Sequence, residues 1–348
     1  MKALLLKNYM HLEYTDVPDP VPADNEVLIE VKAAGICGSD VHGMDGSTGR
    51  RIPPVIMGHE AAGIIISTGN AVTEWKPGDR VTFDSTIYRL DDWYTEKEMY
   101  NLSDNRMVLG VSTPEYKRDG AFAQYITVPQ HILHRIPGNL SFVQAAMTEP
   151  AAVALHAVNL TAPEVNDTAV VFGAGMIGLF LIQLLKLAGC SQVVAVDIEN
   201  DKLKLADISG ATATLNSLTC DVVTEIQKIT DGRGADVAVE AVGISQTIET
   251  GIHSLRKGGT LTLVGNTSPS VEIPLQSIVT RQIRLQGSCA INGEYPAVLY
   301  LLLTEKLKTG HILSAVAPLS EGATWFNRLY NKEKGLIKVV LIPGSTCR

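Results

Sequence analysis

The sequence has few aromatic residues, no basic excess and no long hydrophobic run. Phe, Trp and Tyr make up 5% of its 348 residues, and 29 basic and 37 acidic residues give a formal net charge of −8. An acidic chain without a basic stripe argues against nucleic acid as a partner. The longest uncharged run, residues 168–185, is glycine-rich and slightly short for a membrane span. We therefore expect no membrane association.

Cysteine is also scarce. The chain has an odd number, namely Cys37, Cys190, Cys220, Cys289 and Cys347. The N-terminal segment lacks the apolar core and the small-residue cleavage site of a signal peptide. This pattern excludes a disulfide-dense secreted scaffold and predicts reduced thiols in a cytoplasmic protein.

Two regions with different patterns follow one another along the chain. The first contains short apolar runs between Pro/Gly turns, such as EVLIEVKAAG and DRVTF, which predicts an antiparallel β region. From Glu149 onward strands alternate with helices, which predicts right-handed βαβ crossovers and a doubly wound parallel sheet. We expect one domain from residues 1–152 and 289–348, with the final run LIKVVLIP returning to it, and a second domain from residues 153–288. The expected helices include SQTIETGIHSLRKG over residues 245–258 and YPAVLYLLLTEKLKTG over residues 295–310.

A glycine pattern marks the predicted dinucleotide site. Residues 173–178 read GAGMIG, a G-x-G-x-x-G that follows the strand AVVF and opens a helix. Gly173 makes the tight turn, Gly175 lets a pyrophosphate approach the backbone, and Gly178 lets helix and strand pack closely. The helix N-terminus offers free N–H groups to the phosphates. The predicted cofactor site also includes Met176, Ile177, Lys202, Val242, Val264 and Ser288.

Asp197 ends the next predicted strand, nineteen residues after Gly178. A carboxylate at this position accepts hydrogen bonds from the ribose hydroxyls and repels a 2′-phosphate, so it predicts NAD rather than NADP. In this interpretation Lys202 lies beside the ribose. The alternative is that Asp197 is the N-cap of a helix beginning near Glu199.

Three further segments contain residues that suit a metal. GHEAAGIIISTG places His59 and Glu60 directly before an apolar strand, where burying either without a partner costs on the order of several kcal/mol. GICGSDVHG contributes Cys37, and TEP contributes Glu149. A lone cysteine or histidine is usually an ordinary core residue. Together, however, these donors favour a zinc site.

The chain resembles the zinc-containing medium-chain alcohol and polyol dehydrogenases. GHEAAGIIISTG is similar to the family pattern G-H-E-x2-G-x5-G, and CGSDVHG is similar to C-G-[ST]-D-x-H. EPAAVALHAV resembles a segment of the sorbitol (L-iditol) dehydrogenase branch. The resemblance covers essentially the whole chain. It implies an α/β protein with a GroES-like β-barrel catalytic domain, a Rossmann cofactor domain and an active site between the two.

The resemblance also implies the metal ligands. One catalytic zinc would be held by Cys37, His59 and a carboxylate, and the family leaves open whether Glu60 or Glu149 ligates it directly. The zinc would lower the pKa of a bound alcohol towards ~7, and the hydride would pass to the nicotinamide.

A proton relay is implied as well. It would run through Ser39, the cofactor ribose and His42, with Asp40 supporting a ligand from behind. A turn hydroxyl at Ser39 and a plain surface histidine at His42 are the alternatives.

The sequence departs from the family where many relatives carry a second, structural zinc. The four cysteines that bind it align with Arg89, Asp92, Thr95 and Ser103. A four-cysteine site is therefore impossible, and we expect one zinc per subunit. Arg89 and Asp92 could pair. The lobe would instead be closed by apolar packing of Trp93, Tyr94, Met99 and Tyr100.

A second departure concerns the substrate. Gly43 and Ala290 stand where sorbitol-type relatives carry an aromatic residue and an arginine that meets the polyol. Arg50, Arg51 and Glu115 are candidates for polar substrate contacts, with plain surface positions as the alternative.

The leading prediction is a zinc-dependent enzyme that oxidises a secondary alcohol of a polyol, cyclitol or sugar-derived substrate to a ketone, with hydride transfer to NAD. An L-threonine 3-dehydrogenase-type enzyme is one alternative. A non-catalytic, crystallin-like nucleotide-binding protein is another. Relatives pair through an edge strand, so we expect a homodimer or homotetramer that uses TLTLVGN followed by VEIPL.

Overall fold

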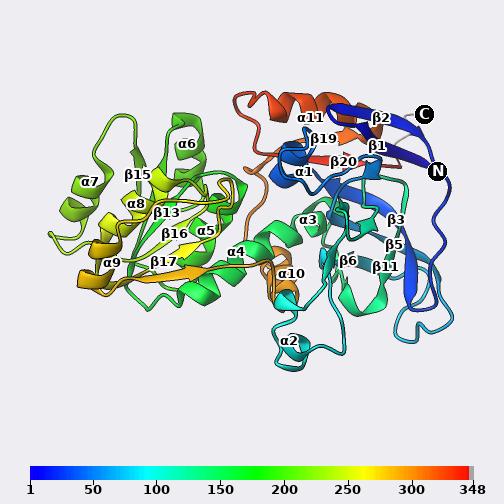
Figure 1. Cartoon of the computed structure of the whole chain (residues 1–348), viewed down its shortest axis with the longest axis horizontal. Coiled ribbons are helices and arrows are strands. Elements are labelled where there is room, and N and C mark those ends of the chain that lie inside the picture. Colours follow the sequence, from blue (N-terminus) through cyan, green and yellow to red (C-terminus); the bar gives the residue numbers. More distant parts are fainter. Residues whose placement is uncertain (345–348) are drawn as a thin grey trace. The chain divides into compact units, whose positions relative to one another are not determined.

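The computed structural model describes residues 1–344, which form two compact units (Figure 1). Unit 1 comprises Met1–Pro150 and the chain from Ile291 onward, and unit 2 comprises Ala151–Ala290. Helix α4(Thr148–Thr161) begins in the first and ends in the second. No helix within residues 1–344 combines the length and the apolar character needed to cross a membrane.

Unit 1 is built mainly from antiparallel strands. Its largest sheet has the order β12-β6-β5-β3-β20-β19, with β11 also paired to β3. These strands are β3(Glu26–Gly35), β5(Glu60–Thr68), β6(Arg80–Phe83), β11(Tyr125–Pro129), β12(Leu133–Arg135), β19(Leu313–Pro318) and β20(Lys338–Ile342). The smaller sheets use β1(Lys2–Asn8), β2(His11–Asp16), β4(Val55–Ile56), β7(Thr86–Ile87), β8(Met107–Val108), β9(Val111–Ser112) and β10(Lys117–Arg118).

Short helices lie between these strands. They are α1(Gly38–Gly43), α2(Trp93–Glu96), α3(Phe142–Ala146), α10(Tyr295–Leu303), α11(Gly322–Tyr330) and the 3₁₀ turns η1(Tyr100–Leu102), η2(Gln130–Ile132) and η3(Leu319–Glu321). The core of the unit buries the inward faces of the strands, and Phe122 packs edge-on against Phe326 of α11. The final strand β20 pairs antiparallel with β3, so the C-terminal run returns to this unit.

Unit 2 is a doubly wound α/β unit. Its six parallel strands have the order β15-β14-β13-β16-β17-β18. Its elements are β13(Thr168–Phe172), α5(Met176–Leu187), β14(Gln192–Asp197), α6(Asn200–Ile208), β15(Ala213–Asn216), α7(Val222–Ile229), β16(Ala235–Glu240), α8(Ser245–Ser254), β17(Leu255–Leu263), α9(Leu275–Arg281) and β18(Arg284–Gly287). Every residue of β13, TAVVF, is buried, as expected for a strand covered on both faces.

Three expectations about the elements were wrong. The helix expected over residues 245–258 ends at Ser254, because Leu255 is extended and pairs with Ala235 at the start of β17. The helix expected from Tyr295 to residue 310 stops at Leu303, soon before Glu305 adopts a left-handed φ of 54°. The sheet edge is β18, which covers β17, and VEIPL forms no strand.

Candidate active site

Three side chains that can ligate a metal converge in unit 1. Cys37 follows β3 as the N-cap residue of α1, His59 directly precedes β5, and Glu60 begins β5 opposite Gly35 of β3. One potential ligand atom from each side chain lies within 4.8 Å of the other two. The pairing of β3 with β5 therefore brings the two sequence motifs together. A thiolate, an imidazole and a carboxylate are the donors that zinc accepts.

The charges around this group suit a cation. Glu60 Oε1 is buried and has no hydrogen-bond partner in the described part of the chain, and His59 Nδ1 faces Asp40 Oδ1 at 3.5 Å. Burial lowers the pKa of His59, but Asp40 and Cys37 outweigh burial and raise this pKa well above its usual value. The surroundings thus favour positive charge at this point, and these residues fit a divalent metal ion.

The other oxygen of Glu60 is bound by a residue that the sequence reasoning missed. Lys338 of β20 donates to Glu60 Oε2 and, at 2.9 Å, to the Ile36 carbonyl, and both ionised side chains are fully buried. A buried charge needs a partner of opposite sign. Lys338 therefore compensates Glu60 and leaves Oε1 as the free oxygen. The only signal in the sequence was a lysine inside the apolar run LIKVVLIP.

Glu149 lies near this group but is not one of the three clustered donors. It stands in the first turn of α4 and accepts a hydrogen bond from Ser85 Oγ at 3.0 Å. Burial raises its pKa to about 7; His59 opposes this rise and Glu60 adds to it. Glu149 can therefore hold or release a proton near neutral pH.

The relay candidates differ in their surroundings. Ser39 Oγ donates to Cys37 Sγ at 3.3 Å, which places its hydroxyl beside a ligand candidate. His42 is exposed at the end of α1, and its carbonyl accepts a hydrogen bond from Ser47.

Asp40 is fully buried, with Oδ1 3.5 Å from His59 Nδ1. Burial alone would raise the pKa of Asp40, yet His59 and Arg51 hold it well below its usual range.

The candidate substrate contacts also differ. Arg50 and Glu115 are exposed, as a surface position predicts. Arg51 is only 3% exposed and pairs with Asp40, so the surface interpretation of Arg51 was wrong.

In unit 2 the glycine-rich turn has the shape that dinucleotide binding requires. Gly173 has a φ of +92°, and a Cβ there would lie 2.7 Å from Val242 Cγ2. A Cβ on Gly178 would collide with the Gly173 carbonyl oxygen. Gly175 is the N-cap residue of α5, and Met176 and Ile177 form its first turn, so the free N–H groups of the helix lie at this turn.

Asp197 is the last residue of β14, and its carboxylate accepts hydrogen bonds from the backbone of two turns. Its Oδ2 accepts from Ala174 N at 2.7 Å, and its Oδ1 accepts from Glu199 N at 2.9 Å. The N-cap of α6 is Glu199, so Asp197 does not occupy that position. Lys202 pairs with Glu199 at 2.6 Å. Each oxygen of Asp197 keeps a lone pair for a further donor such as a ribose hydroxyl.

The remaining cofactor candidates lie at the ends of neighbouring strands. Glu240, which the sequence reasoning missed, is fully buried at the end of β16 and accepts from the backbone N–H groups of Val242 and Gly243 at 2.9 and 2.8 Å. Val264 N donates to the Glu240 carbonyl at 2.8 Å. Ser288 follows β18, and its Oγ is buried without a partner among the described residues.

Known proteins are similar to this chain in sequence and in architecture. A model of the alcohol dehydrogenase GroES-like domain matches residues 23–138, and a zinc-binding dehydrogenase model matches residues 177–304. Sorbitol dehydrogenase of Bacillus subtilis is 33% identical over 349 residues, which cover 99% of this chain and 98% of that protein. The chain belongs to the zinc-containing medium-chain alcohol and polyol dehydrogenase family.

Two further relatives extend the comparison. D-xylulose reductase A of Aspergillus oryzae is 30% identical over 336 residues, covering 94% of this dehydrogenase and 93% of that protein. A zinc-binding dehydrogenase structure from Sinorhizobium meliloti 1021, bound to NADP, has a TM-score of 0.89 and 31% identity over 98% of this chain and 99% of that one. The predicted GroES-like and Rossmann folds are confirmed. The chain is an oxidoreductase that acts on small-molecule alcohols with zinc and a nicotinamide cofactor.

The lobe at residues 89–103 of this dehydrogenase is closed by hydrogen bonds. Ser103 Oγ donates to Asp92 and accepts from Arg89 N at 3.1 Å, and Asp92 Oδ1 accepts from Thr95 N at 2.9 Å. Arg89, Asp92, Thr95 and Ser103 thus form one network. Of the expected apolar packing of Trp93, Tyr94, Met99 and Tyr100, the part assigned to Trp93 was wrong, because this residue is 60% exposed, whereas the other three are half-buried. The suggested partner of Arg89 was also wrong, because its guanidinium binds Asp91.

Replacing Asp92 with alanine should loosen this lobe. The substitution removes an N-cap and the acceptor of Ser103, so the lobe should open roughly tenfold more often. Amide hydrogen exchange followed by mass spectrometry measures this opening. Asp91→Ala is the matched control, because Asp91 makes only an exposed ion pair. Equal exchange in the two variants would show that the network does not close the lobe.

Asp84, a buried carboxyl group that contacts Tyr100 of the lobe, makes the free energy of unfolding depend on pH. Asp84 is 1% exposed, and it accepts from Thr86 N at 2.8 Å and from Tyr100 OH at 3.2 Å. Burial raises its pKa to about 7, above the value near 3.9 of an unfolded chain. The folded state therefore holds this proton more tightly, and its stability falls as pH rises from about 4 to about 7.

Asp84→Asn copies the protonated acid and should remove this contribution. Between about pH 5 and about pH 9 the wild type should lose on the order of 2 kcal/mol of unfolding free energy that the variant keeps. Urea unfolding at the two pH values measures the difference. If both proteins change equally with pH, Asp84 is not the group responsible.

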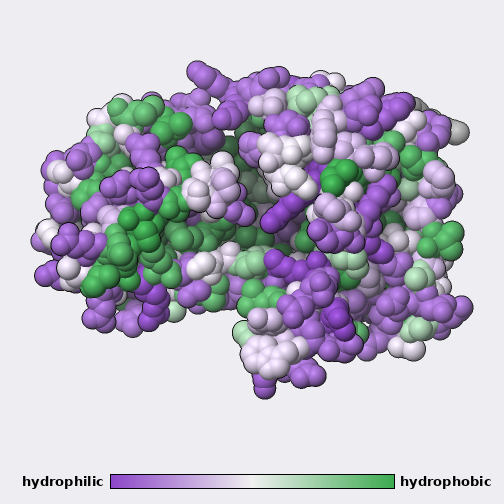
Figure 2. Space-filling view, viewed as in Figure 1, coloured by the Kyte–Doolittle hydropathy of each residue, from purple (hydrophilic) through white to green (hydrophobic). Residues whose placement is uncertain are grey.

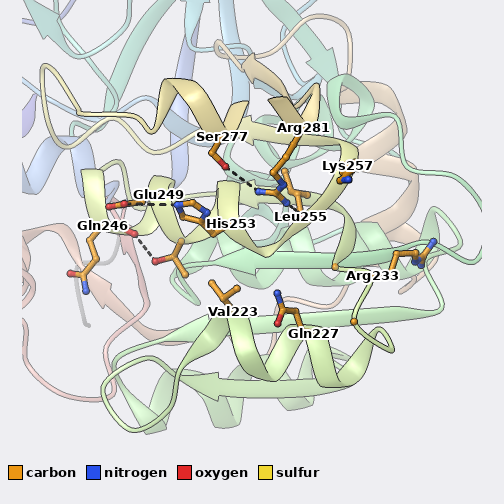
Figure 3. A pocket seen from close by; sticks show the side chains of 13 residues that line it. Val223, Gln227, Arg233, Gln246, Glu249, His253, Leu255, Lys257, Ser277 and Arg281 are labelled. Atoms are coloured by element: carbon orange, nitrogen blue, oxygen red, sulfur yellow. Dashed lines mark hydrogen bonds and ion pairs between the residues drawn. The ribbon is translucent and has the colours of Figure 1, made fainter. Parts of the chain in front are cut away.

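A groove of about 630 Å³ on unit 2 is lined by residues of α7, α8, α9 and neighbouring loops (Figure 3). Three of its basic side chains already have partners, whereas Lys257 is exposed. Arg281 donates to the Ile252 carbonyl at 3.0 Å, Arg233 binds Asp236 at 3.1 Å, and His253 lies 3.9 Å from Glu249. No predicted site residue lines this groove, and we assign it no function.

Proposed function

We propose that this dehydrogenase oxidises a secondary alcohol of a polyol, cyclitol or sugar-derived substrate to a ketone, with NAD as the hydride acceptor. The observation that carries the proposal is the convergence of Cys37, His59 and Glu60 within 4.8 Å. The sorbitol dehydrogenase and xylulose reductase relatives support a polyol substrate. We further propose one zinc per subunit, because the lobe at residues 89–103 has no cysteine.

In this proposal Cys37, His59 and Glu60 Oε1 hold the zinc. When bound, zinc supplies the positive charge that makes an alcohol acidic near neutral pH. Ser39 Oγ, beside Cys37 Sγ, would accept the proton of the substrate hydroxyl while its own hydroxyl proton passes on along the relay. The exposed His42 is the proposed group that passes the proton to solvent. Glu149 can exchange a proton at its carboxyl, since its pKa is raised to about 7.

The cofactor proposal depends on Asp197. It stands at the end of β14, beside the turn that contains Ala174, and its negative charge opposes a 2′-phosphate. Gly173, Gly175 and Gly178 supply the turn that receives the pyrophosphate.

We also propose a homodimer or homotetramer in a reducing, cytoplasmic compartment. Strand β18 is an open edge of the parallel sheet. Figure 2 shows hydrophobic side chains over the neighbouring α9 region, where Ile273, Leu275 and Val279 are 43%, 65% and 69% exposed. Among the described residues, Cys37, Cys190, Cys220 and Cys289 form no disulfide, whereas Cys347 lies outside them.

A substrate panel tests the proposal. Sorbitol, xylitol, myo-inositol, L-threonine and a simple secondary alcohol are supplied with NAD, and NADH formation is followed by absorbance. One polyol or cyclitol should exceed L-threonine at least about tenfold in kcat/KM, a preference of about 1.4 kcal/mol. A preference for L-threonine would refute the polyol proposal. Metal analysis should find one zinc per chain, and two would refute the single-zinc proposal.

A further inference from the structure

Arg51 is buried close to the proposed metal ligands, although it lies in a loop. Its guanidinium donates to Asp40 Oδ1 from Nε at 3.3 Å and from Nη2 at 2.8 Å. Nη2 also lies 3.5 Å from Ser39 Oγ, and Nη1 donates to the Arg50 carbonyl at 3.1 Å. The loop is fixed to β9, because Ile52 N donates to the Ser112 carbonyl at 3.0 Å.

Both side-chain partners of Arg51 stand directly behind a ligand candidate. Asp40 Oδ1 is 3.5 Å from His59 Nδ1, and Ser39 Oγ is 3.3 Å from Cys37 Sγ. One planar guanidinium therefore connects the supports of two of the three donors. The N–H groups of a guanidinium lie in one plane, so they fix the direction of their hydrogen bonds better than an ammonium group can.

The glycine at position 43 belongs to the same arrangement. A Cβ on Gly43 would collide with Arg51 Cγ and lie 3.3 Å from Arg51 Cβ. The arginine stem therefore needs the space that a side chain at position 43 would take. Gly43 and Arg51 are a matched pair, and the absence of an aromatic residue at position 43 follows from the presence of the arginine.

Two other roles for Arg51 fit less well. Binding an anionic substrate requires free N–H groups and exposure, but this guanidinium is bound to Asp40 and to a carbonyl, and the residue is 3% exposed. Compensating Glu60 is already the task of Lys338. Each of the two carboxylates around His59 thus has its own buried cation.

We propose that Arg51 is a positioning residue for the metal centre: it fixes Asp40 behind His59 and Ser39 beside Cys37. This inference rests on the proposed function, since it assumes that Cys37 and His59 bind the metal. Groups that hold ligands from behind typically change metal affinity or activity 10–100-fold when they are removed.

The test compares Arg51→Met, Arg51→Lys and Gly43→Ala with the wild type and with Arg50→Met, a matched control at the exposed neighbour. Zinc affinity is measured by competition with a chromophoric chelator. The visible spectrum of the Co²⁺-substituted protein reports the ligand geometry. Arg51→Met should bind zinc roughly 10–100-fold more weakly, with an altered cobalt spectrum. Its kcat should fall while KM for the cofactor stays unchanged, and Arg50→Met should match the wild type.

Two variants keep the test decisive if Arg51→Met does not fold. Arg51→Lys keeps the charge without the fork and should recover only part of the affinity. Gly43→Ala displaces the arginine stem without changing its chemistry and should weaken zinc binding in the same direction. Wild-type affinity and cobalt spectra in the folded Arg51 and Gly43 variants would overturn the role of Arg51 alone. A wild type that binds zinc no better than Cys37→Ser would instead overturn the proposed metal site.

Discussion

Replacing Cys37 with serine should lower kcat/KM for alcohol oxidation by about a thousandfold or more. The thiolate is the softest of the three clustered donors, and a serine hydroxyl is a poor zinc ligand. Loss of the metal removes several kcal/mol of transition-state stabilisation, and about 4 kcal/mol corresponds to a factor of a thousand. Steady-state kinetics and metal analysis of the same preparation measure both consequences.

A matched control separates metal loss from general damage. Cys220→Ser changes another partly buried thiol that forms no disulfide, and it should keep both activity and zinc content. The circular dichroism of both variants should equal that of the wild type. A Cys37→Ser enzyme that keeps full activity, or that loses activity with its zinc still bound, would contradict the proposed ligand set.

Replacing Asp197 with asparagine should shift the cofactor preference from NAD towards NADP by roughly a hundredfold. The amide still offers an acceptor to the turn but no longer repels a 2′-phosphate. Hydrogen bonds to a charged group contribute about 1.5–3 kcal/mol, so kcat/KM with NAD should fall on the order of tenfold to a hundredfold. Kinetics with each cofactor and fluorescence titration with NADH and NADPH measure the change.

The position of Asp197 demands a control for the turn itself. Its oxygens accept from Ala174 N and Glu199 N, so a damaged turn would weaken binding of both cofactors. Glu199→Gln alters the same turn without touching the candidate carboxylate. An unchanged NAD/NADP ratio in Asp197→Asn would show that another group determines the preference.

The ligand candidates were predictable because each lies in a short, distinctive motif. The motifs identified Cys37 and His59 as ligand candidates, and the pairing of β3 with β5 brings them together. Arg51 and Lys338 were not predictable in the same way. The local sequence gives no sign that Arg51 is buried, and for Lys338 the apolar run around it is the only one. Their burial arises from the contact of one loop with β9 and from the insertion of β20 beside β3.

The errors in the elements have a common physical origin. Residues 245–258 were expected to form one helix, yet strand pairing with Ala235 takes Leu255 into β17. The apolar run LTLV at residues 261–264 was expected to belong to the edge strand of the parallel sheet. The strand order shows instead that β18 pairs with β17 and forms the edge. Pairing partners distant in sequence decide these boundaries, and propensity alone does not.

The insertion of β20 makes the metal pocket depend on a contact between segments that are distant in sequence. Lys338, the countercharge of Glu60, lies 278 residues further along the chain. Without β20 beside β3, Glu60 would be buried with no ammonium group beside it. The pocket is therefore complete only once β20 has paired with β3, and the ligand motifs alone cannot build it.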